Sequence, residues 1–180
     1  MNNFDLHNPT RILFGKGRIK DLGAQIPSDA KVLMIYGGGS AERTGVLAQV
    51  RSALGDREVV EFGGIEPNPR YATALKAVDV IAAEGITYLL AVGGGSVIDA
   101  TKFIAAAAKF SGDPWEILTS FGRAITSALP FGTVLTLPAT ASEMNEGSVI
   151  TNAEKGAKLP FRSAHCYPQF SVLDPELTYT

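Results

Sequence analysis

Cysteine and histidine are scarce in this chain of 180 residues, which contains one cysteine, Cys166, and two histidines, His7 and His165. A single cysteine excludes an internal disulfide and suits a reducing compartment, so we expect a cytoplasmic protein. The two histidines are far apart and lack a His or Asp partner at metal-ligand spacing, so these residues predict no metal site. We interpret Cys166 as a packing residue and His165 as a loop residue.

Basic runs and long apolar runs are absent as well. The formal net charge is −2, and the clustered Lys and Arg that neutralise phosphates are not found, which disfavours a nucleic-acid partner. The most hydrophobic stretch, 86–110, is interrupted by three glycines, Asp99 and Lys102, and does not predict a membrane span. Residues 1–7 are polar and lack the apolar segment of a signal peptide. We therefore expect a soluble protein without a membrane partner.

The composition that remains is typical of one compact α/β domain over residues 1–180. Hydrophobic residues make up 46% of the chain and charged residues 19%, and there are 19 glycines. Short apolar runs predict strands at 11–14, 32–36, 58–62, 88–92, 130–137 and 170–173. Apolar residues at helical spacing predict helices over 41–54, 71–83 and 96–110, and a short one opening at 113–115. Alternating strands and helices predict a parallel sheet with helices on both faces.

Two glycine-rich turns follow two of the predicted strands. The strand 88–92 leads into Gly93-Gly94-Gly95-Ser96, and the strand 32–36 leads into Gly37-Gly38-Gly39-Ser40. Glycines remove the Cβ atoms that would block a phosphate, and the next helix presents its positively polarised N-terminus. One such turn is equally well explained as a tight connection. Two of them, together with the loop 65–69, follow strand carboxyl ends, where ligands of parallel sheets gather, and this favours a nucleotide site.

Other motif residues leave alternatives open. The turns match neither the Gly-x-Gly-x-x-Gly fingerprint nor the phosphate loop of kinases. Asp99, three residues after Ser96, either stabilises the helix dipole from the first turn or uses its carboxylate to bind a ribose hydroxyl or hold the turn. The hydroxyls and amide of segment 136–145 either cap a following helix or grip a cofactor or substrate.

Three motifs occur in order along the chain: Gly-Gly-Gly-Ser-x-x-Asp at 93–99, Leu-Pro-Ala-Thr-x-Ser-Glu at 137–143 and Leu-Asp-Pro-Glu-Leu-Thr at 173–178. With the opening segment 2–17, they resemble the metal-dependent, or iron-containing, alcohol dehydrogenases, in particular the branch of NADPH-dependent aldehyde reductases and butanol dehydrogenases. The resemblance covers all 180 residues. It implies a Rossmann-like sheet and the interconversion of small aldehydes and primary alcohols by metal-assisted hydride transfer.

The resemblance also implies where a dinucleotide would lie. The pyrophosphate would rest on the second glycine turn, supported by Asp99, and the nicotinamide and its ribose would lie against segment 136–149. Lys158 would reach the ribose or a phosphate, although alone it is typical of a solvated lysine; Asn68 would close the loop side, and Leu177 would lie near the adenosine. The implied cofactor-binding residues are Gly37, Gly38, Gly39, Ser40, Asn68, Gly94, Gly95, Ser96, Asp99, Thr136, Leu137, Thr140, Asn145, Val149, Lys158 and Leu177.

The first glycine turn bears on which dinucleotide is bound. The resemblance implies that many NAD-dependent family members have an Asp in this turn. Its carboxylate accepts a hydrogen bond from the adenosine 2′-hydroxyl and repels a 2′-phosphate. This chain has Gly38, Gly39 and Ser40 instead, so we expect NADP(H) rather than NAD(H). Similar proteins often carry two lysines after the turn, whereas this chain has Glu42, which opposes a 2′-phosphate, and then Arg43, which suits one. Ala141 also differs, since the family commonly has Gly there.

The resemblance places a divalent metal, iron or zinc, on one Asp and three His of a second, helical domain beyond the last motif. The sequence ends at Thr180, short of those ligands, so we expect the C-terminal metal domain to be absent and no catalytic residue to be present. We expect this cofactor-binding half to be inactive alone. It would expose apolar surface and associate, with the strand 11–14 suited to edge pairing in a homodimer.

Two other interpretations stay open. A dehydroquinate-synthase-like lyase has a related cofactor domain, but the segment Leu-Pro-Ala-Thr-x-Ser-Glu fits it poorly. Alternatively, the chain acting alone is a nucleotide-binding or oligomerisation module without turnover.

Overall fold

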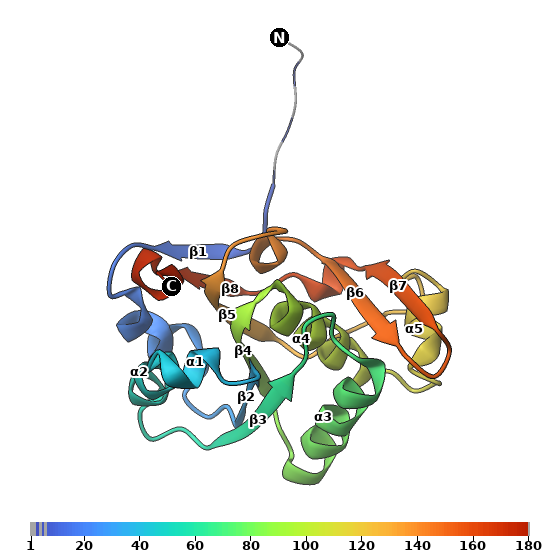
Figure 1. Cartoon of the computed structure of the whole chain (residues 1–180), viewed down its shortest axis with the longest axis horizontal. Helices are drawn as coiled ribbons and strands as arrows, with labels where there is room; N and C mark the ends of the chain where they lie inside the picture. Colours follow the sequence, from blue (N-terminus) through green and yellow to red (C-terminus); the bar gives the residue numbers. More distant parts are fainter. Residues whose placement is uncertain (1–2, 4, 6, 180) are drawn as a thin grey trace.

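The structure, a computed structural model, describes residues 3, 5 and 7–179, with the Ser40 side chain excepted. Its centre is a six-stranded parallel sheet in the spatial order β1-β8-β5-β4-β2-β3 (Figure 1). Its strands are β1 (Arg11–Phe14), β2 (Val32–Gly37), β3 (Val59–Ile65), β4 (Tyr88–Gly94), β5 (Phe131–Leu137) and β8 (Phe170–Leu173). The predicted parallel α/β sheet is confirmed.

Helices cover both faces of this sheet, as predicted. One face packs against α3 and α4, and the other against α2 and the 3-10 helix η1. The α-helices are α1 (Ser40–Arg43), α2 (Val46–Leu54), α3 (Tyr71–Glu84), α4 (Gly95–Ala107) and α5 (Trp115–Thr119). The 3-10 helices are η1 (Arg18–Gln25), η2 (Ser142–Met144), η3 (Ala164–Cys166) and η4 (Pro175–Thr178).

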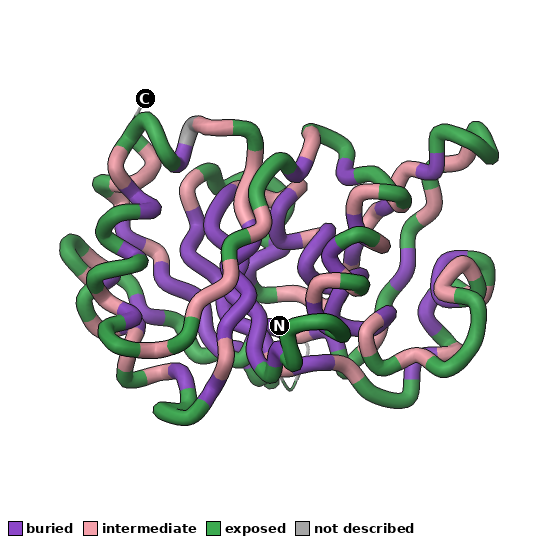
Figure 2. The backbone as a smooth tube through the Cα atoms, turned by 90° about the horizontal axis from the view of Figure 1, so that it is seen from below, coloured by how far each residue is buried: buried purple, intermediate pink, exposed green. Residues whose placement is uncertain are grey.

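Strand β2 shows why the apolar runs are continuous. Leu33 and Ile35 belong to the core shared with α3 and α4, whereas Val32 and Met34 pack with α2 and η1. Successive side chains of a strand point to opposite faces, and both faces are buried here, so every position is apolar. Buried residues accordingly concentrate along the central strands in Figure 2.

The order of the strands creates a switch point between β2 and β4. From β2 the chain moves outward to β3, then returns across β2 to β4 and proceeds in the opposite direction through β5 to β8. At such a point the connections after the two strands diverge and leave a crevice outside their carboxyl ends. Both glycine turns lie at this position, one after β2 and one at the end of β4.

Several predicted boundaries are wrong in detail. The helix predicted over 41–54 is broken, because Gly45 takes the left-handed conformation (φ 75°) between α1 and α2. The strand predicted over 58–62 continues to Ile65, with Gly63 lying so close under the Tyr36 ring that a Cβ would be 2.6 Å from it. Helix α4 starts at Gly95 and ends at Ala107, not at 96 and 110.

The segment after β5 corrects a larger expectation. Segment 136–145 does not lead into an α-helix; it passes through the short η2 and enters a two-stranded antiparallel hairpin. The hairpin strands are β6 (Gly147–Asn152) and β7 (Ala157–Arg162). Ile150 and Phe161 bury its inner face in the core beside α4. The sequence reasoning missed this hairpin because β6 has only two apolar residues, Val149 and Ile150, and β7 contains Pro160.

Strand β1 forms one edge of the sheet and pairs with β8. Its residue Phe14 is 70% exposed, and its neighbour Ile12 is 40% exposed. Within the described residues, none of the helices has both the length and the hydropathy required to traverse a bilayer.

Candidate functional site

The two glycine turns lie beside each other at the switch point. Gly37 pairs with Ile65 of β3, and a Cβ built on Gly37 would be 3.6 Å from Cγ2 of Val97 in the first turn of α4. The turn after β2 therefore borders the helix that the other glycine turn starts. Gly38 has no neighbouring atom within 4 Å of where its Cβ would lie, so this turn faces open space.

The second turn places the start of α4 directly at the end of β4. Gly93 must be glycine here, because a Cβ would be 2.6 Å from the Val97 side chain. Gly94 is the N-cap residue and no side chain caps the helix, so its first N–H groups are available to an anion. Cβ positions on Gly94 and Gly95 would lie 3.2 Å from Leu137 and 3.4 Å from Thr140 Oγ1. The turn thus borders the segment that follows β5.

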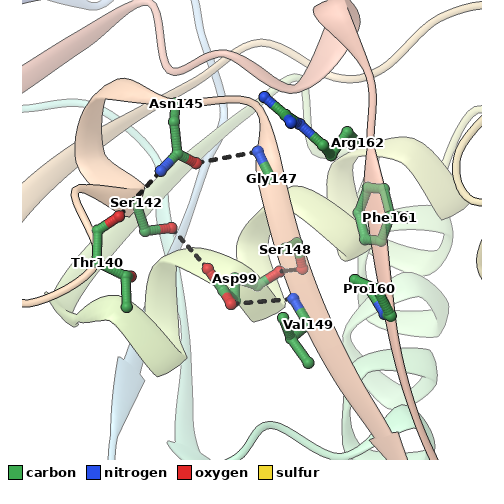
Figure 3. Close-up of a pocket in the computed structure, with 10 residues that line it drawn as sticks. All are labelled: Asp99, Thr140, Ser142, Asn145, Gly147, Ser148, Val149, Pro160, Phe161 and Arg162. Atoms are coloured by element: carbon green, nitrogen blue, oxygen red, sulfur yellow. Dashed lines mark hydrogen bonds between the residues drawn. The ribbon is translucent and has the colours of Figure 1, made fainter.

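Asp99 joins α4 to the hairpin. Its Oδ1 accepts a hydrogen bond from Ser142 Oγ at 2.6 Å, and its Oδ2 accepts one from the Val149 backbone N–H at 3.0 Å (Figure 3). Ser148 Oγ donates to the Asp99 carbonyl oxygen at 2.8 Å. Because α4 starts at Gly95, Asp99 lies beyond the first turn, which corrects the helix-dipole interpretation. Burial raises the pKa of the Asp99 carboxyl, and the hydrogen bond from Ser142 opposes that rise.

Lys102, one turn further along α4, is completely buried. Its ammonium donates to Ser142 Oγ at 2.8 Å, to Asn145 Oδ1 at 2.9 Å and to the Gly147 carbonyl oxygen at 2.7 Å. All three N–H bonds of the ammonium therefore have acceptors. Burial lowers the pKa of Lys102 to about 8, and the Asp99 charge opposes this shift.

The segment held by Lys102 has a strained backbone. Ala141 takes the left-handed conformation with φ of 54°, which costs a residue with a Cβ on the order of 1 kcal/mol. Asn145 bridges the segment, since its Nδ2 donates to the Thr140 carbonyl oxygen at 3.1 Å and its Oδ1 accepts from the Gly147 N–H at 3.0 Å. The side chain of Asn145 thus fixes the distance between the two ends of the turn.

These residues surround a cavity of about 340 Å³ between α4, η2 and the hairpin (Figure 3). It is lined by Asp99, Thr140, Ser142, Asn145, Gly147, Ser148, Val149, Pro160, Phe161 and Arg162. Four sequence-predicted site residues therefore meet in one cavity: Asp99, Thr140, Asn145 and Val149. The others implied for the nicotinamide side, Thr136 and Leu137, end β5; Thr136 is half-buried and Leu137 is exposed.

Asn68 and Lys158 lie together although they are distant in sequence. Lys158 Nζ donates to Asn68 Oδ1 at 2.7 Å, and both residues are exposed. The neighbouring Pro69 carbonyl accepts from the Thr151 N–H at 2.9 Å, which attaches the loop 65–69 to β6. The proline loop and the hairpin therefore form one continuous rim.

Leu177 lies at a separate cavity of about 380 Å³. Its lining residues are Gly17, Thr44, Val46, Gln49, Asp174, Glu176, Leu177 and Tyr179. The buried Asp174 fixes η4 there, because its carboxylate accepts from the Gly17 N–H at 2.6 Å and from the Glu176 N–H at 3.1 Å. Leu177 thus lies beside the start of α2, away from the cavity of Asp99.

Two charged residues, Glu42 and Arg43, follow the first glycine turn. A Cβ built on Gly39 would lie 3.3 Å from Nη1 of Arg43, which places the guanidinium over the turn. Glu42 and Arg43 are both exposed. Ser40 begins α1, and its side chain is outside the described residues.

Comparison with known proteins identifies the family. A family model described as iron-containing alcohol dehydrogenase matches residues 9–175. The chain belongs to the iron-containing alcohol dehydrogenase family. It is 60% identical over its whole length to the NADPH-dependent aldehyde reductase YqhD of Escherichia coli strain K12, and 50% identical to a probable NADH-dependent butanol dehydrogenase of Bacillus subtilis strain 168.

The fold agrees with that of solved family members. A crystal structure of Escherichia coli YqhD superposes with a TM-score of 0.96 at 60% identity, over 99% of this chain and 46% of that one. The chain spans about half the length of the curated relatives it matches, 47% of each of the two proteins above. The family match favours the alcohol dehydrogenase resemblance over the lyase alternative.

The metal that the family description implies does not fit the residues described here. Among residues 3, 5 and 7–179, no group of three His, Cys, Asp or Glu side chains is close enough to hold a metal ion. Cys166 is fully buried, and burial raises the pKa of its thiol to about 12, so it stays protonated near neutral pH. His165 is exposed in a loop.

Sequence reasoning did not single out two residues that organise this cavity, Lys102 and Ser142. Lys102 follows Asp99 by three residues, so both lie on the same face of a helix, and this spacing was a usable signal. Ser142 gave none beyond its place among the hydroxyls of segment 136–145. Their connection is visible only once η2 is placed against α4.

Proposed function

We propose that this chain is the NADP(H)-binding half of an oxidoreductase that interconverts aldehydes and primary alcohols by metal-assisted hydride transfer. The observation that carries the proposal is the pair of adjacent glycine turns at the switch point, where α4 presents uncapped N–H groups. The relatives named for aldehyde reduction and butanol oxidation supply the substrate class. Among the residues described here, no group of three His, Cys, Asp or Glu side chains could hold the metal that this reaction uses.

In this proposal the pyrophosphate lies over Gly94, Gly95 and Ser96. The adenosine extends past Gly37–Ser40 toward Leu177, and the nicotinamide riboside extends toward the cavity of Asp99. When bound, the nicotinamide supplies or accepts the hydride. The chain's own part is to hold the dinucleotide: Thr140, Asn145 and Val149 border the nicotinamide side, and Lys158 with Asn68 closes the rim.

NADP(H) is proposed over NAD(H) because Arg43 covers a turn that has no carboxylate. The guanidinium can donate two hydrogen bonds to a 2′-phosphate, which a 2′-hydroxyl cannot match. Gly38 faces open space and has no left-handed backbone, so an aspartate can be placed there without strain. That carboxylate would accept from a 2′-hydroxyl and repel a 2′-phosphate.

A fluorescence titration of this chain with NADPH and with NADH tests both parts of the proposal. We expect tighter binding of NADPH. Arg43→Ala should weaken NADPH binding about tenfold and leave NADH unchanged, and Gly38→Asp should reverse the preference. Lys31→Met, at the opposite end of the strands, is the control. Binding of neither nucleotide would contradict a cofactor-binding role for this chain, and equal binding of both would contradict the NADP(H) preference.

We also propose that β1 supports association of two chains through its free edge. Exposed apolar side chains on an edge strand, Ile12 and Phe14, are unfavourable in water and suited to pairing. Phe14→Asp should convert a dimer to a monomer, measured by sedimentation equilibrium. A monomeric wild-type chain would contradict this pairing.

A chain that binds NADPH but shows no aldehyde reduction would fit the alternative of a binding module without turnover. Measurable aldehyde reduction by this chain would overturn that alternative.

A further inference from the structure

Lys102 is buried in a position that the glycine turns and the dinucleotide do not explain. It comes from the second turn of α4, and its ammonium donates hydrogen bonds to three residues that line the cavity, Ser142, Asn145 and Gly147. Burying an ammonium costs desolvation free energy unless each N–H is paired, and an apolar residue at this position would fill the core without that cost. The buried lysine therefore indicates a role in positioning the segment to which it donates.

Lys102 determines the orientation of the Asn145 amide. An amide side chain has one accepting and one donating end, and rotation by 180° exchanges them. The Lys102 ammonium can only donate, so it requires Oδ1 of Asn145 to face it, at 2.9 Å. The Gly147 N–H, at 3.0 Å from the same oxygen, imposes the same orientation.

With Oδ1 held inward, Nδ2 takes the other side. One of its hydrogens bonds to the Thr140 carbonyl oxygen at 3.1 Å, and the second has no acceptor among the described residues. Asn145 is half-buried and lines the cavity of about 340 Å³ (Figure 3). The group that it offers to a bound molecule is therefore an N–H donor and not an oxygen.

We propose that Lys102 is a positioning residue that fixes the Asn145 amide so that it presents a hydrogen-bond donor to the nicotinamide side of the bound dinucleotide. This rests on the proposed function, since the acceptor of that hydrogen bond would be an oxygen of the bound dinucleotide, such as a ribose or carboxamide oxygen. The same clamp holds Ser142 against Asp99, and so orders the strained turn at Ala141.

The experiment compares Lys102→Met with the wild-type chain using two probes. NADPH has both halves of the dinucleotide, whereas adenosine 2′,5′-bisphosphate has only the adenosine side. We expect Lys102→Met to weaken NADPH binding about tenfold and to change the bisphosphate affinity less than about twofold. Equal losses for both probes would reduce Lys102 to a general structural role, and no loss for either would overturn the proposal.

Arg57→Met is the matched control for loss of a cationic clamp. The Arg57 guanidinium also donates to backbone carbonyls, those of Gly23, Ile26, Pro27 and Leu54, but it lies just before β3, at the amino ends of the strands and away from the cavity. We expect this variant to lose stability and to bind both probes as the wild type does. If it also lost NADPH affinity selectively, the effect of Lys102→Met would not be specific.

A second measurement needs no nucleotide. The side-chain NH2 signals of Asn145 in a ¹⁵N NMR spectrum report the amide's environment, and we expect them to shift and exchange faster in Lys102→Met. Unchanged Asn145 signals would overturn the positioning role even if NADPH binding fell. A wild-type chain that binds no dinucleotide would contradict the proposed function, and these signals would still decide whether Lys102 orients Asn145.

Discussion

The two ends of the candidate site are built in different ways. The turn at Gly37–Arg43 is formed by backbone, with exposed charges laid over it and open space above Gly38. The segment from Thr140 to Val149 is held by two side chains of α4, the buried Lys102 and the half-buried Asp99. Substitutions in the first region should therefore alter ligand preference with little effect on the fold, whereas substitutions in the second should also lower its stability.

The largest effect is expected where the two regions meet, at Gly95→Val. A branched side chain there occupies the space over the N-terminus of α4, so NADPH and NADH binding should both fall by more than about 100-fold. The fold should tolerate it, because the nearest atom to the new Cβ is Thr140 Oγ1 at 3.4 Å. Titration and thermal unfolding measure the two quantities. Unchanged affinity would mean that the turn is only a structural connection.

The next largest effect is on stability, where substitutions in the two regions should differ in how far they lower the free energy of unfolding. Lys102→Met removes the buried ammonium that donates to three acceptors, so the free energy of unfolding should fall by about 3 kcal/mol. Arg43→Ala alters an exposed side chain and should change it by less than about 0.5 kcal/mol. Urea denaturation of both variants measures these changes. Equal losses would contradict the contrast between the two ends of the site.

The same contrast explains what could be predicted from the sequence. The sheet, its faces and both glycine turns depend on local patterns, namely apolar runs and Gly-Gly-Gly-Ser, and these were predicted. The break at Gly45 and the hairpin β6–β7 were missed, since each depends on what the segment packs against. Lys102 is an extreme case: a lysine in an apolar helix predicts exposure, and only its three distant acceptors make its burial tolerable.

For the candidate site, the sequence indicated which residues line the cavity but not the contacts that hold them there. Asp99, Thr140, Asn145 and Val149 were implied by the family resemblance and do line one cavity. Their contacts, however, run through Ser142 and the backbone of β6, partners that lie more than forty positions from Asp99. No spacing rule in the sequence reports such a pair, because the approach of η2 to α4 depends on packing of the whole hairpin.

The smallest predicted effect is the dependence of stability on pH. The pKa of Lys102 in the folded chain is about 8, against 10.5 ordinarily, because burial disfavours the charged form. The groups facing it are Asp99 of α4, Glu143 and Glu146 around η2, and Cys166 of η3. Between these two pKa values the unfolded chain binds more protons than the folded one, so the contribution of Lys102 to stability rises with pH over that window.

From pH 8 to pH 9 this contribution should amount to about 1 kcal/mol, taken as the difference between wild type and Lys102→Met in urea denaturation. The variant cancels the effect of every other group that titrates in the same range. Parallel pH curves for the two proteins would show that Lys102 keeps its proton, and its ammonium would then hold all three acceptors throughout. A rise confined to the wild type would instead show that the clamp on Asn145 loses one of its three donors above pH 8, while the exposed turn at Arg43 is untouched.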